Sequence, residues 1–270
     1  MDGSVFGRYR ITQKIGEGGI TEVWAATHEA MQREVVIKLL QPEMSAQQDI
    51  VKRFFSEAQA TACIDHPGIV KVFDVGYARD GRAYISMEKL SGESLEQRLQ
   101  RQNFLAVQVA LRLIRQLAGA VGAAHKRKII HRDLNPSNVF IVSDPEVPGG
   151  ERIKVVDFGL AGLIESRSSQ LITRGMVLGT PAYMAPEQRC NPAAAQAPSH
   201  LYSIGCILYR SLTGRPPYGI GGFDATAEHP SSQLLPPYYL RSDMPREIDE
   251  LVMSLLAEAP EQRPQTCAEL

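Results

Sequence analysis

The chain has 270 residues, enough for a large two-lobed domain with a real core, and its formal net charge is −1. This near balance of charges gives no basis for a nucleic-acid-binding or polybasic membrane surface, so we expect no nucleic acid among the partners. The four cysteines form no Cys-x-x-Cys pair, which disfavours a zinc site or a disulfide framework and is typical of reduced thiols.

The chain opens on a polar segment, Met1-Asp2-Gly3-Ser4, that lacks the apolar stretch of a signal peptide. It contains no run of about 18 apolar residues, so we expect a cytoplasmic protein with no membrane segment in this chain. Near the other end, Pro264-Gln265-Thr266 has the character of a helix start, and only one turn follows. This abrupt end predicts a fragment of a longer protein, which leaves open a membrane anchor beyond residue 270.

The first third of the chain is rich in alternating and β-branched segments, which are typical of strands. Strands are predicted over residues 9–15, 22–28, 34–40, 69–76 and 83–87. Apolar residues at helical spacing predict a single helix over residues 50–64. We therefore expect a small lobe over residues 1–87, built from an antiparallel sheet and one main helix, followed by a short polar connector over residues 88–92.

Residues 93–270 are predicted to form a larger, mainly helical lobe, so the fold class is α+β and bilobal. The longest amphipathic helix is predicted over residues 105–125. Residues 143–151, rich in proline and glycine, are interpreted as a surface loop between two short strands. The cleft between two such lobes is the default ligand site.

Six motifs follow one another along the chain, and five of their polar residues suit the handling of a nucleotide and a metal ion, namely Lys38, Glu57, Asp133, Asn138 and Asp157. The motifs are Gly16-x-Gly18, Val35-Val36-Ile37-Lys38, Glu57 on the predicted helix, His131-Arg132-Asp133-Leu134-Asn135-Pro136-Ser137-Asn138, Asp157-Phe158-Gly159 and Ala185-Pro186-Glu187. Together they resemble the motifs of the eukaryotic-like (Hanks-type) serine/threonine protein kinases that occur in bacteria. The resemblance covers residues 9–270 and implies the bilobal protein-kinase-like fold. It also implies ATP and Mg²⁺ as cofactors and transfer of the γ-phosphoryl group to Ser or Thr hydroxyls of protein substrates.

The resemblance assigns a nucleotide site to the small lobe and the connector. Glycines let a backbone approach phosphates closely, although Gly16-x-Gly18 alone also fits a plain hairpin turn. Lys38 is expected to bind the α and β phosphates while an ion pair with Glu57 holds it in place. The remaining cofactor-binding residues are Ile15, Gly16, Gly18, Val23 and Val36, the gatekeeper Met87, and Glu88 and Leu90 at the adenine edge.

The catalytic residues are likewise assigned by resemblance. Asp133 is the expected base that orients the substrate hydroxyl, and Asn138 and Asp157 are the expected ligands of Mg²⁺, which favours hard oxygen donors. His131 is expected to pack beneath Phe158 as a structural residue.

The segment 157–187 is expected to be the activation segment. Arg132 indicates activation by phosphorylation of this segment, which implies a transient homodimer for trans-autophosphorylation. Thr180 is expected to bond Asp133, and Glu187 is expected to pair with Arg263. The candidate phosphorylation sites are Ser166, Ser168, Ser169 and, first by position, Thr173.

Four positions depart from the family pattern. Asn135 replaces the lysine that contacts the γ-phosphate, and His200 replaces an aspartate that accepts backbone N–H bonds from the catalytic loop. Thr21 replaces the third glycine of the turn, and Val36 replaces an alanine over the adenine. These departures motivate a second hypothesis, a pseudokinase that acts as a nucleotide-binding or scaffolding module. A small-molecule kinase is disfavoured by the peptide-docking motifs around Thr180 and Glu187.

Overall fold

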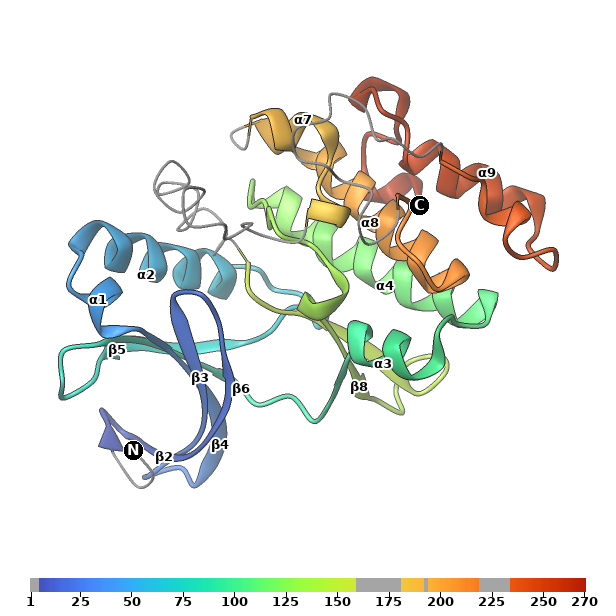
Figure 1. The fold of residues 1–270 in the computed structure, drawn as a ribbon. Helices are drawn as coiled ribbons and strands as arrows, with labels where there is room; N and C mark the ends of the chain where they lie inside the picture. Colours follow the sequence, from blue (N-terminus) through green and yellow to red (C-terminus); the bar gives the residue numbers. More distant parts are fainter. Residues whose placement is uncertain (1–4, 159–180, 192–193, 219–233) are drawn as a thin grey trace. The chain divides into compact units, whose positions relative to one another are not determined.

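The computed structural model describes residues 5–158, 181–191, 194–218 and 234–270 (Figure 1). The chain divides into two compact units. The first, called the sheet unit here, comprises Met1–Asp65 and Ile69–Ser91; the second, called the helical unit, comprises His66–Gly68 and Gly92–Leu270.

The sheet unit contains a six-stranded antiparallel sheet in the order β1-β2-β3-β4-β6-β5. Its strands are β1 (Val5–Phe6), β2 (Tyr9–Glu17), β3 (Thr21–His28), β4 (Arg33–Leu40), β5 (Val72–Tyr77) and β6 (Ala83–Glu88). Side chains alternate between the faces of a strand, so Val35, Ile37 and Leu39 on β4 all enter the core on one face. The residues between them on β4 point to the other face.

Helix α2 (Gln48–Ala62) packs against β5 and β6 of this sheet. It buries residues at the spacing of one helical face, namely Ile50, Val51, Phe54, Ala58 and Thr61. The predicted helix over residues 50–64 and the five predicted strands are therefore confirmed, although β5 begins at Val72 rather than at residue 69. The short elements β1 and α1 (Pro42–Ser45) were not predicted, because they are too short to show a periodic pattern.

The helical unit contains a three-stranded antiparallel sheet of β7 (Gly92–Ser94), β8 (Val139–Ser143) and β9 (Glu151–Val155). The two short strands flanking the loop at 143–151 are thus confirmed. The connector predicted over 88–92 is shorter, because Glu88 ends β6 and Gly92 begins β7. A Cβ atom at Gly92 would lie 2.0 Å from the carbonyl oxygen of Ile141, so only glycine permits this approach of β7 to β8.

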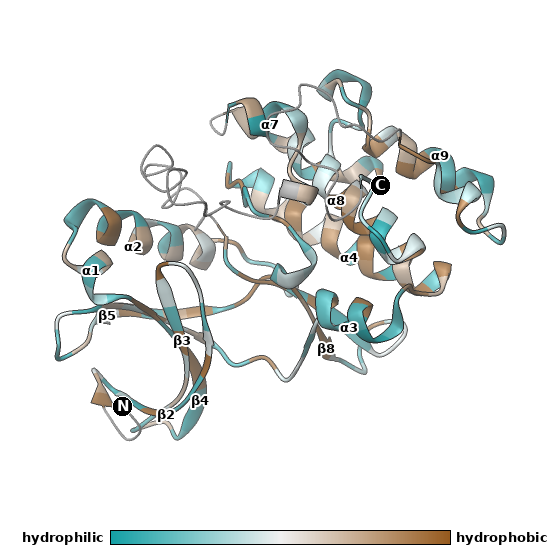
Figure 2. Ribbon diagram, viewed as in Figure 1, coloured by the Kyte–Doolittle hydropathy of each residue, from teal (hydrophilic) through white to brown (hydrophobic). Residues whose placement is uncertain are grey.

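The remainder of the helical unit is built around two helices, α4 (Val107–Lys126) and α8 (Ala197–Thr213), which pack against each other. The predicted helix over residues 105–125 corresponds to α4. Figure 2 shows α8 as largely hydrophobic, and nearly every residue from Ser199 to Leu212 is buried, as expected for a central helix. The other elements are α3 (Leu95–Gln102), η1 (Pro136–Asn138), η3 (Pro181–Tyr183), α7 (Pro186–Cys190), η5 (Pro237–Tyr239), α9 (Arg246–Leu255), η6 (Pro260–Gln262) and η7 (Cys267–Glu269). The α+β fold class is confirmed.

Candidate active site

The glycine turn joins β2 to β3 at the edge of the sheet unit. Gly16 pairs with Val23, and the N–H of Gly18 donates to the carbonyl of Thr21 at 2.7 Å, which closes the turn. Thr21, at the third glycine position of the pattern, begins β3 and is only 5% exposed. Ile15 is the extra residue of a β-bulge between Lys14 and Gly16, and it is half exposed. The threonine is thus accommodated as an ordinary strand residue.

Four of the predicted nucleotide-binding residues share one face of the sheet. Val23 on β3 is paired with Lys38 on β4, and Val36 on β4 is paired with Met87 on β6. Directly paired residues of antiparallel strands project to the same face, as do Val36 and Lys38, which are two residues apart. This face is opposite to the one that carries the core residue Val35 and its neighbours. Strand register alone therefore brings these four side chains together.

Lys38 is buried, with 6% of its surface exposed, at the centre of the sheet. Glu57 lies on α2 in the same unit and is half-buried beside the apolar face of that helix. A buried ammonium group is costly without a partner, which favours a structural or functional role for Lys38 over an incidental one. The ion pair between Lys38 and Glu57 stays a prediction.

The end of β6 carries the residues predicted for the adenine edge. The carboxylate of Glu88 accepts the backbone N–H of Lys71 at 2.7 Å, and the Glu88 N–H donates to the Lys71 carbonyl at 2.9 Å. These two bonds fix the backbone of Glu88 where the strand ends. Leu90 follows in the connector and is half-buried.

In the helical unit, two asparagine amides hold the carboxylate of Asp133. Asn135 Nδ2 donates to Asp133 Oδ1 at 3.0 Å, and Asn138 Nδ2 donates to Asp133 Oδ2 at 3.3 Å. Both amides also donate to the Asp133 carbonyl, at 3.1 and 2.8 Å. The other end of the Asn135 amide caps η1, where Oδ1 accepts the N–H of Ser137 at 2.9 Å. Asn135 therefore orients Asp133 and starts η1 at the same time.

Asn138 and Asp157 lie at the same end of the β8–β9 hairpin. Val139 pairs with Val155, and the N–H of Val156 donates to the Asn138 carbonyl at 3.0 Å. The Asn138 amide nitrogen is engaged with Asp133, which leaves Oδ1 as the atom available to a metal ion, and Asp157 carries carboxylate oxygens. Such hard oxygen donors suit Mg²⁺, which keeps several of its waters and needs few protein ligands. No group of three or more His, Cys, Asp and Glu side chains able to hold a metal occurs among the described residues.

His131 ties the catalytic loop to the segment that carries Asp157. Its side chain is fully buried, its Nε2 lies 2.8 Å from the Val156 carbonyl, and its ring lies 4.7 Å from that of Phe158. The predicted packing of His131 against Phe158 is confirmed. Burial lowers the pKa of His131, so its neutral form is favoured. Neutral His131 donates through Nε2–H to this carbonyl.

Two residues of the catalytic loop and the proposed metal site, Arg132 and Asp157, have left-handed backbones without being glycine. Arg132 has φ 66° and Asp157 has φ 61°. Such conformations cost about 1–3 kcal/mol each and persist where surrounding contacts impose them. One such contact is the hydrogen bond from Gln188 Nε2 on α7 to the carbonyl of Arg132, at 2.6 Å. This contact was not predicted from the sequence.

His200 on α8 supplies a further contact to the same backbone. Its Nε2 accepts the N–H of His131 at 2.9 Å and lies 3.3 Å from the N–H nitrogen of Arg132. Its side chain is fully buried, and burial lowers its pKa well below the ordinary value of 6.5, so it is a neutral acceptor. The neutral ring of His200 therefore accepts a backbone N–H at the position where the family pattern has an aspartate.

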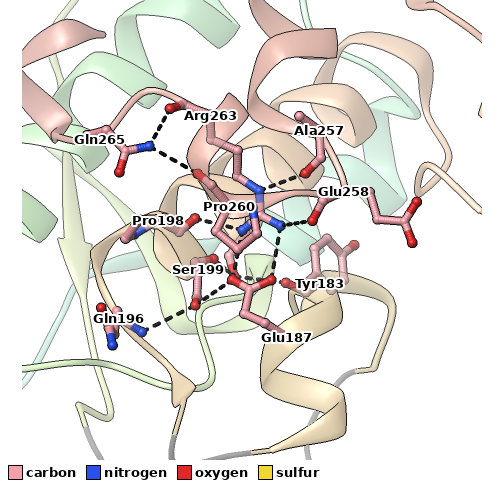
Figure 3. Close-up of polar contacts among 11 residues, drawn as sticks. Tyr183, Glu187, Gln196, Pro198, Ser199, Ala257, Glu258, Pro260, Arg263 and Gln265 are labelled. Carbon is pink, nitrogen blue, oxygen red and sulfur yellow. Dashed lines mark hydrogen bonds and ion pairs between the residues drawn. The ribbon is translucent and has the colours of Figure 1, made fainter.

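The predicted pair of Glu187 and Arg263 is also confirmed (Figure 3). The two terminal guanidinium nitrogens, Nη1 and Nη2, donate to the carboxylate at 2.8 and 3.0 Å, and Ser199 Oγ donates to the same group at 2.7 Å. Arg263 also donates to three backbone carbonyls, those of Ala257, Pro198 and Glu258. Burial alone would raise the pKa of Glu187, but the bonds from Arg263 and Ser199 outweigh it, and the pKa is lowered. The bridge is structural and joins α7 to the end of the chain.

Several predicted residues lie outside the described part of the chain. They are Gly159, Ser166, Ser168, Ser169, Thr173 and Thr180. Within the described part, no helix is both long and apolar enough to cross a membrane.

Comparison with known proteins shows which family this chain resembles. The sequence model of the protein kinase domain matches residues 9–270. Serine/threonine-protein kinase PknA of Mycobacterium tuberculosis is 35% identical over 262 residues, covering 95% of this chain and 58% of the relative. PknB of Mycolicibacterium smegmatis is 33% identical and pkn2 of Myxococcus xanthus 37% identical, and the chain spans only 42% and 32% of their lengths.

Solved structures agree with the sequence relatives. The crystal structure of the Mycobacterium tuberculosis PknI kinase domain has a TM-score of 0.75 and 27% identity, with 100% of this chain and 95% of that chain covered. The apo form of PpkA-294, at 23% identity and a TM-score of 0.78, shows the same fold. The chain therefore belongs to the protein kinase family, as a domain of the Hanks type found in bacterial serine/threonine kinases.

Proposed function

We propose that this chain transfers the γ-phosphoryl group of ATP to serine or threonine hydroxyls of protein substrates. The observation that carries the proposal is the catalytic loop, in which Asn135 and Asn138 hold both carboxylate oxygens of Asp133. A general base acts only when it is positioned against the group whose proton it accepts. The sequence relatives with that activity in their names support the same reaction.

The sheet unit supplies the nucleotide-binding residues of the proposal. Val23, Val36 and Met87 form an apolar surface for adenine on the face that also carries Lys38. The Lys38 ammonium binds the α and β phosphates, and Glu57 orients it. The backbone of Glu88 and Leu90 binds the adenine edge, and the Gly16–Gly18 turn covers the phosphates.

The helical unit supplies the acceptor side of the reaction. Asp133 orients the substrate hydroxyl and accepts its proton as the bond to phosphorus forms. Asn138 and Asp157 hold Mg²⁺, which neutralises charge on the phosphate oxygens when it is bound. Because the Asn135 amide already donates to Asp133, Asn135 acts in this proposal as an orienting residue. Its amide is neutral and brings no positive charge to the γ-phosphate.

The absence of a positive charge at position 135 favours a second candidate function, that of a pseudokinase. Removing one positioned donor to a developing charge costs roughly 10²–10³ in rate in other enzymes, so the missing lysine weakens the case for catalysis. The other departures weigh less, because His200 restores the acceptor and Thr21 fits into β3.

The finer features of the proposal concern regulation and location. Autophosphorylation occurs within residues 157–187, at one or more of Ser166, Ser168, Ser169 and Thr173, through a transient homodimer. The phosphate produced there pairs with Arg132, whose guanidinium suits bidentate binding. We place the reaction in the cytoplasm, with proteins and not nucleic acids as partners.

Intact-mass spectrometry of the purified chain after incubation with ATP and Mg²⁺ tests the proposal. The wild type is expected to gain phosphates that map to residues 166–173, and Asp133→Asn is expected to gain none. Asp243→Asn, which changes an exposed aspartate paired with Arg241, is the matched control and should behave as wild type.

If neither the chain nor a generic substrate gains mass, the result supports the pseudokinase hypothesis and contradicts the kinase proposal. Mg²⁺-dependent ATP binding is then read separately by thermal shift, since a ligand at 100-fold its Kd stabilises by about 2.7 kcal/mol. A shift without phosphorylation identifies a nucleotide-binding module, and no shift overturns the nucleotide site as well.

A further inference from the structure

Two histidines of the helical unit form a hydrogen-bonded pair beneath the catalytic loop. His125, in the last turn of α4, has its Nε2 2.7 Å from His200 Nδ1, and the planes of the two rings are nearly parallel, at 7°. The pair ends at the free cysteine Cys267 of η7, whose Sγ lies 3.8 Å from His125 Nδ1. The sequence motifs assign no role to His125 or Cys267.

The contacts of His200 determine which ring nitrogen carries its proton. Its Nε2 faces two backbone N–H groups, those of His131 and Arg132, which can only donate. Nε2 must therefore bring a lone pair, and the single proton of the neutral ring is on Nδ1. The His200 Nδ1–H then donates to His125 Nε2.

The same reasoning fixes the second ring. Since His125 Nε2 accepts from His200, the proton of neutral His125 is on Nδ1, directed at Cys267 Sγ. Burial raises the pKa of the Cys267 thiol to about 11, so the sulfur is a neutral, weak acceptor. Burial also lowers the pKa of His125, in agreement with two neutral rings.

We propose that His125 is a positioning residue of this kinase domain, whose Nε2 lone pair stabilises the Nδ1–H tautomer of His200 and thereby holds the backbone of residues 131 and 132 in place for Asp133. The proposal rests on the proposed function only in its kinetic consequence. Arg132 has a left-handed backbone, so the loop needs fixed partners on its N–H and carbonyl groups, and His200 and Gln188 provide them.

A carboxylate at position 200 would demand the opposite arrangement. It would accept the two backbone N–H groups and also an N–H from His125, whose proton would then move to Nε2. His125 is thus an acceptor in this chain and would be a donor in a His200→Asp variant. This reversal separates a tautomer-fixing role from simple packing.

Among the described residues, the hydrogen-bond contacts of these two rings include no carboxylate that could compensate a positive charge on either ring. His200 faces His125 and the backbone of residues 131 and 132, and His125 faces Cys267. Asp133 and Asp157 act on His131, whose Nε2 is engaged with the Val156 carbonyl. Protonating His200 would bring an N–H against two N–H donors and release the loop.

The test is a long-range ¹H–¹⁵N correlation spectrum of the histidine rings in the uniformly ¹⁵N-labelled chain at neutral pH, a readout that needs no activity. The expected result is a proton on Nδ1 of both His200 and His125, and on Nε2 of His125 in His200→Asp. A proton on His200 Nε2, a charged ring, or a His125 tautomer unchanged in His200→Asp would overturn the proposal.

Kinetics of the same variants add a second arm. His125→Phe keeps a ring but removes the lone pair, leaving a buried N–H unsatisfied, so kcat should fall about tenfold or more. His125→Gln retains an acceptor oxygen and should recover most of that loss, and the loss should shrink when His200→Asp is already present. Equal losses in both backgrounds would overturn the proposal.

The matched control is His28→Phe, which removes a buried histidine whose ring meets that of Tyr9 edge-to-face in the sheet unit. It should leave both tautomers and kcat as in the wild type. If no variant, nor the wild type, phosphorylates any substrate, the proposed function fails while the spectra still decide the tautomers.

Discussion

The two units hold their proposed site residues by different means. In the sheet unit, Val23, Val36, Lys38 and Met87 reach one face through strand register, so backbone ladders do the positioning. In the helical unit, Asp133 sits in a loop held by side chains from elsewhere, including His200 on α8 and Gln188 on α7. The sheet therefore tolerates a substitution such as Thr21, whereas the loop needs a specific partner for each polar backbone group.

The largest expected effect tests whether the helical unit depends on its buried bridge. Glu187→Ala leaves Arg263, whose side chain is 0% exposed, without its carboxylate, and removing one partner of a buried pair costs about 3–5 kcal/mol. Denaturant unfolding should show this loss. Arg246→Ala breaks the exposed pair with Glu250 and should change the free energy of unfolding by less than about 0.5 kcal/mol. Similar losses in both would show that burial does not distinguish the two pairs.

Asn135→Lys tests how the amide at position 135, where the family pattern has a lysine, affects kcat. A lysine restores a positive charge for the γ-phosphate but removes the bond to Asp133 Oδ1 and the cap of η1. We expect kcat on a peptide substrate to rise about tenfold or more, by analogy with a restored transition-state donor. Loss of the cap should lower the free energy of unfolding by about 1 kcal/mol. A fall in kcat would mean that orienting Asp133 outweighs the missing charge.

Val36→Ala probes the face of the sheet unit. Its extra methyl groups crowd the proposed adenine surface, and overpacking costs about 1–3 kcal/mol, so the KM for ATP should fall by up to about tenfold. Val35→Ala, the neighbour on the core face, should instead lower the stability without changing KM, because its side chain is buried in the core. An effect of both substitutions on KM would contradict the assignment of the two faces.

The smallest expected effect is the pH dependence of stability. The pKa of His200 is lower in the folded chain than its ordinary value of 6.5, so the unfolded chain binds more protons as the pH falls below 6.5. The stabilisation from neutral His200 is therefore complete above pH 6.5 and is lost below it. Denaturant unfolding at a series of pH values should show a steeper decline below 6.5 for the wild type than for His200→Asp. Parallel curves would show that His200 does not titrate in this way.

The sequence by itself determined the elements and most of the proposed site. Periodicities of 2 and 3.6 residues identify the predicted strands and the helices over residues 50–64 and 105–125, because one face of each must be buried. The order of Lys38, Glu57, Asp133, Asn138 and Asp157 identified the family that the chain belongs to. Even the Glu187–Arg263 bridge followed from the resemblance to that family.

Only the tertiary structure decided how the departures are accommodated. That His200 finds an acceptor in His125 depends on residues 75 positions apart meeting at hydrogen-bond distance, and that Asn135 turns its amide to Asp133 depends on the conformation of the loop that carries both. The short elements β1, α1 and β7 likewise depend on contacts, as at Gly92, where only the approach of the Ile141 carbonyl explains the glycine. Local pattern reports which face of an element is buried, but the partner of a polar group is set by packing between distant segments.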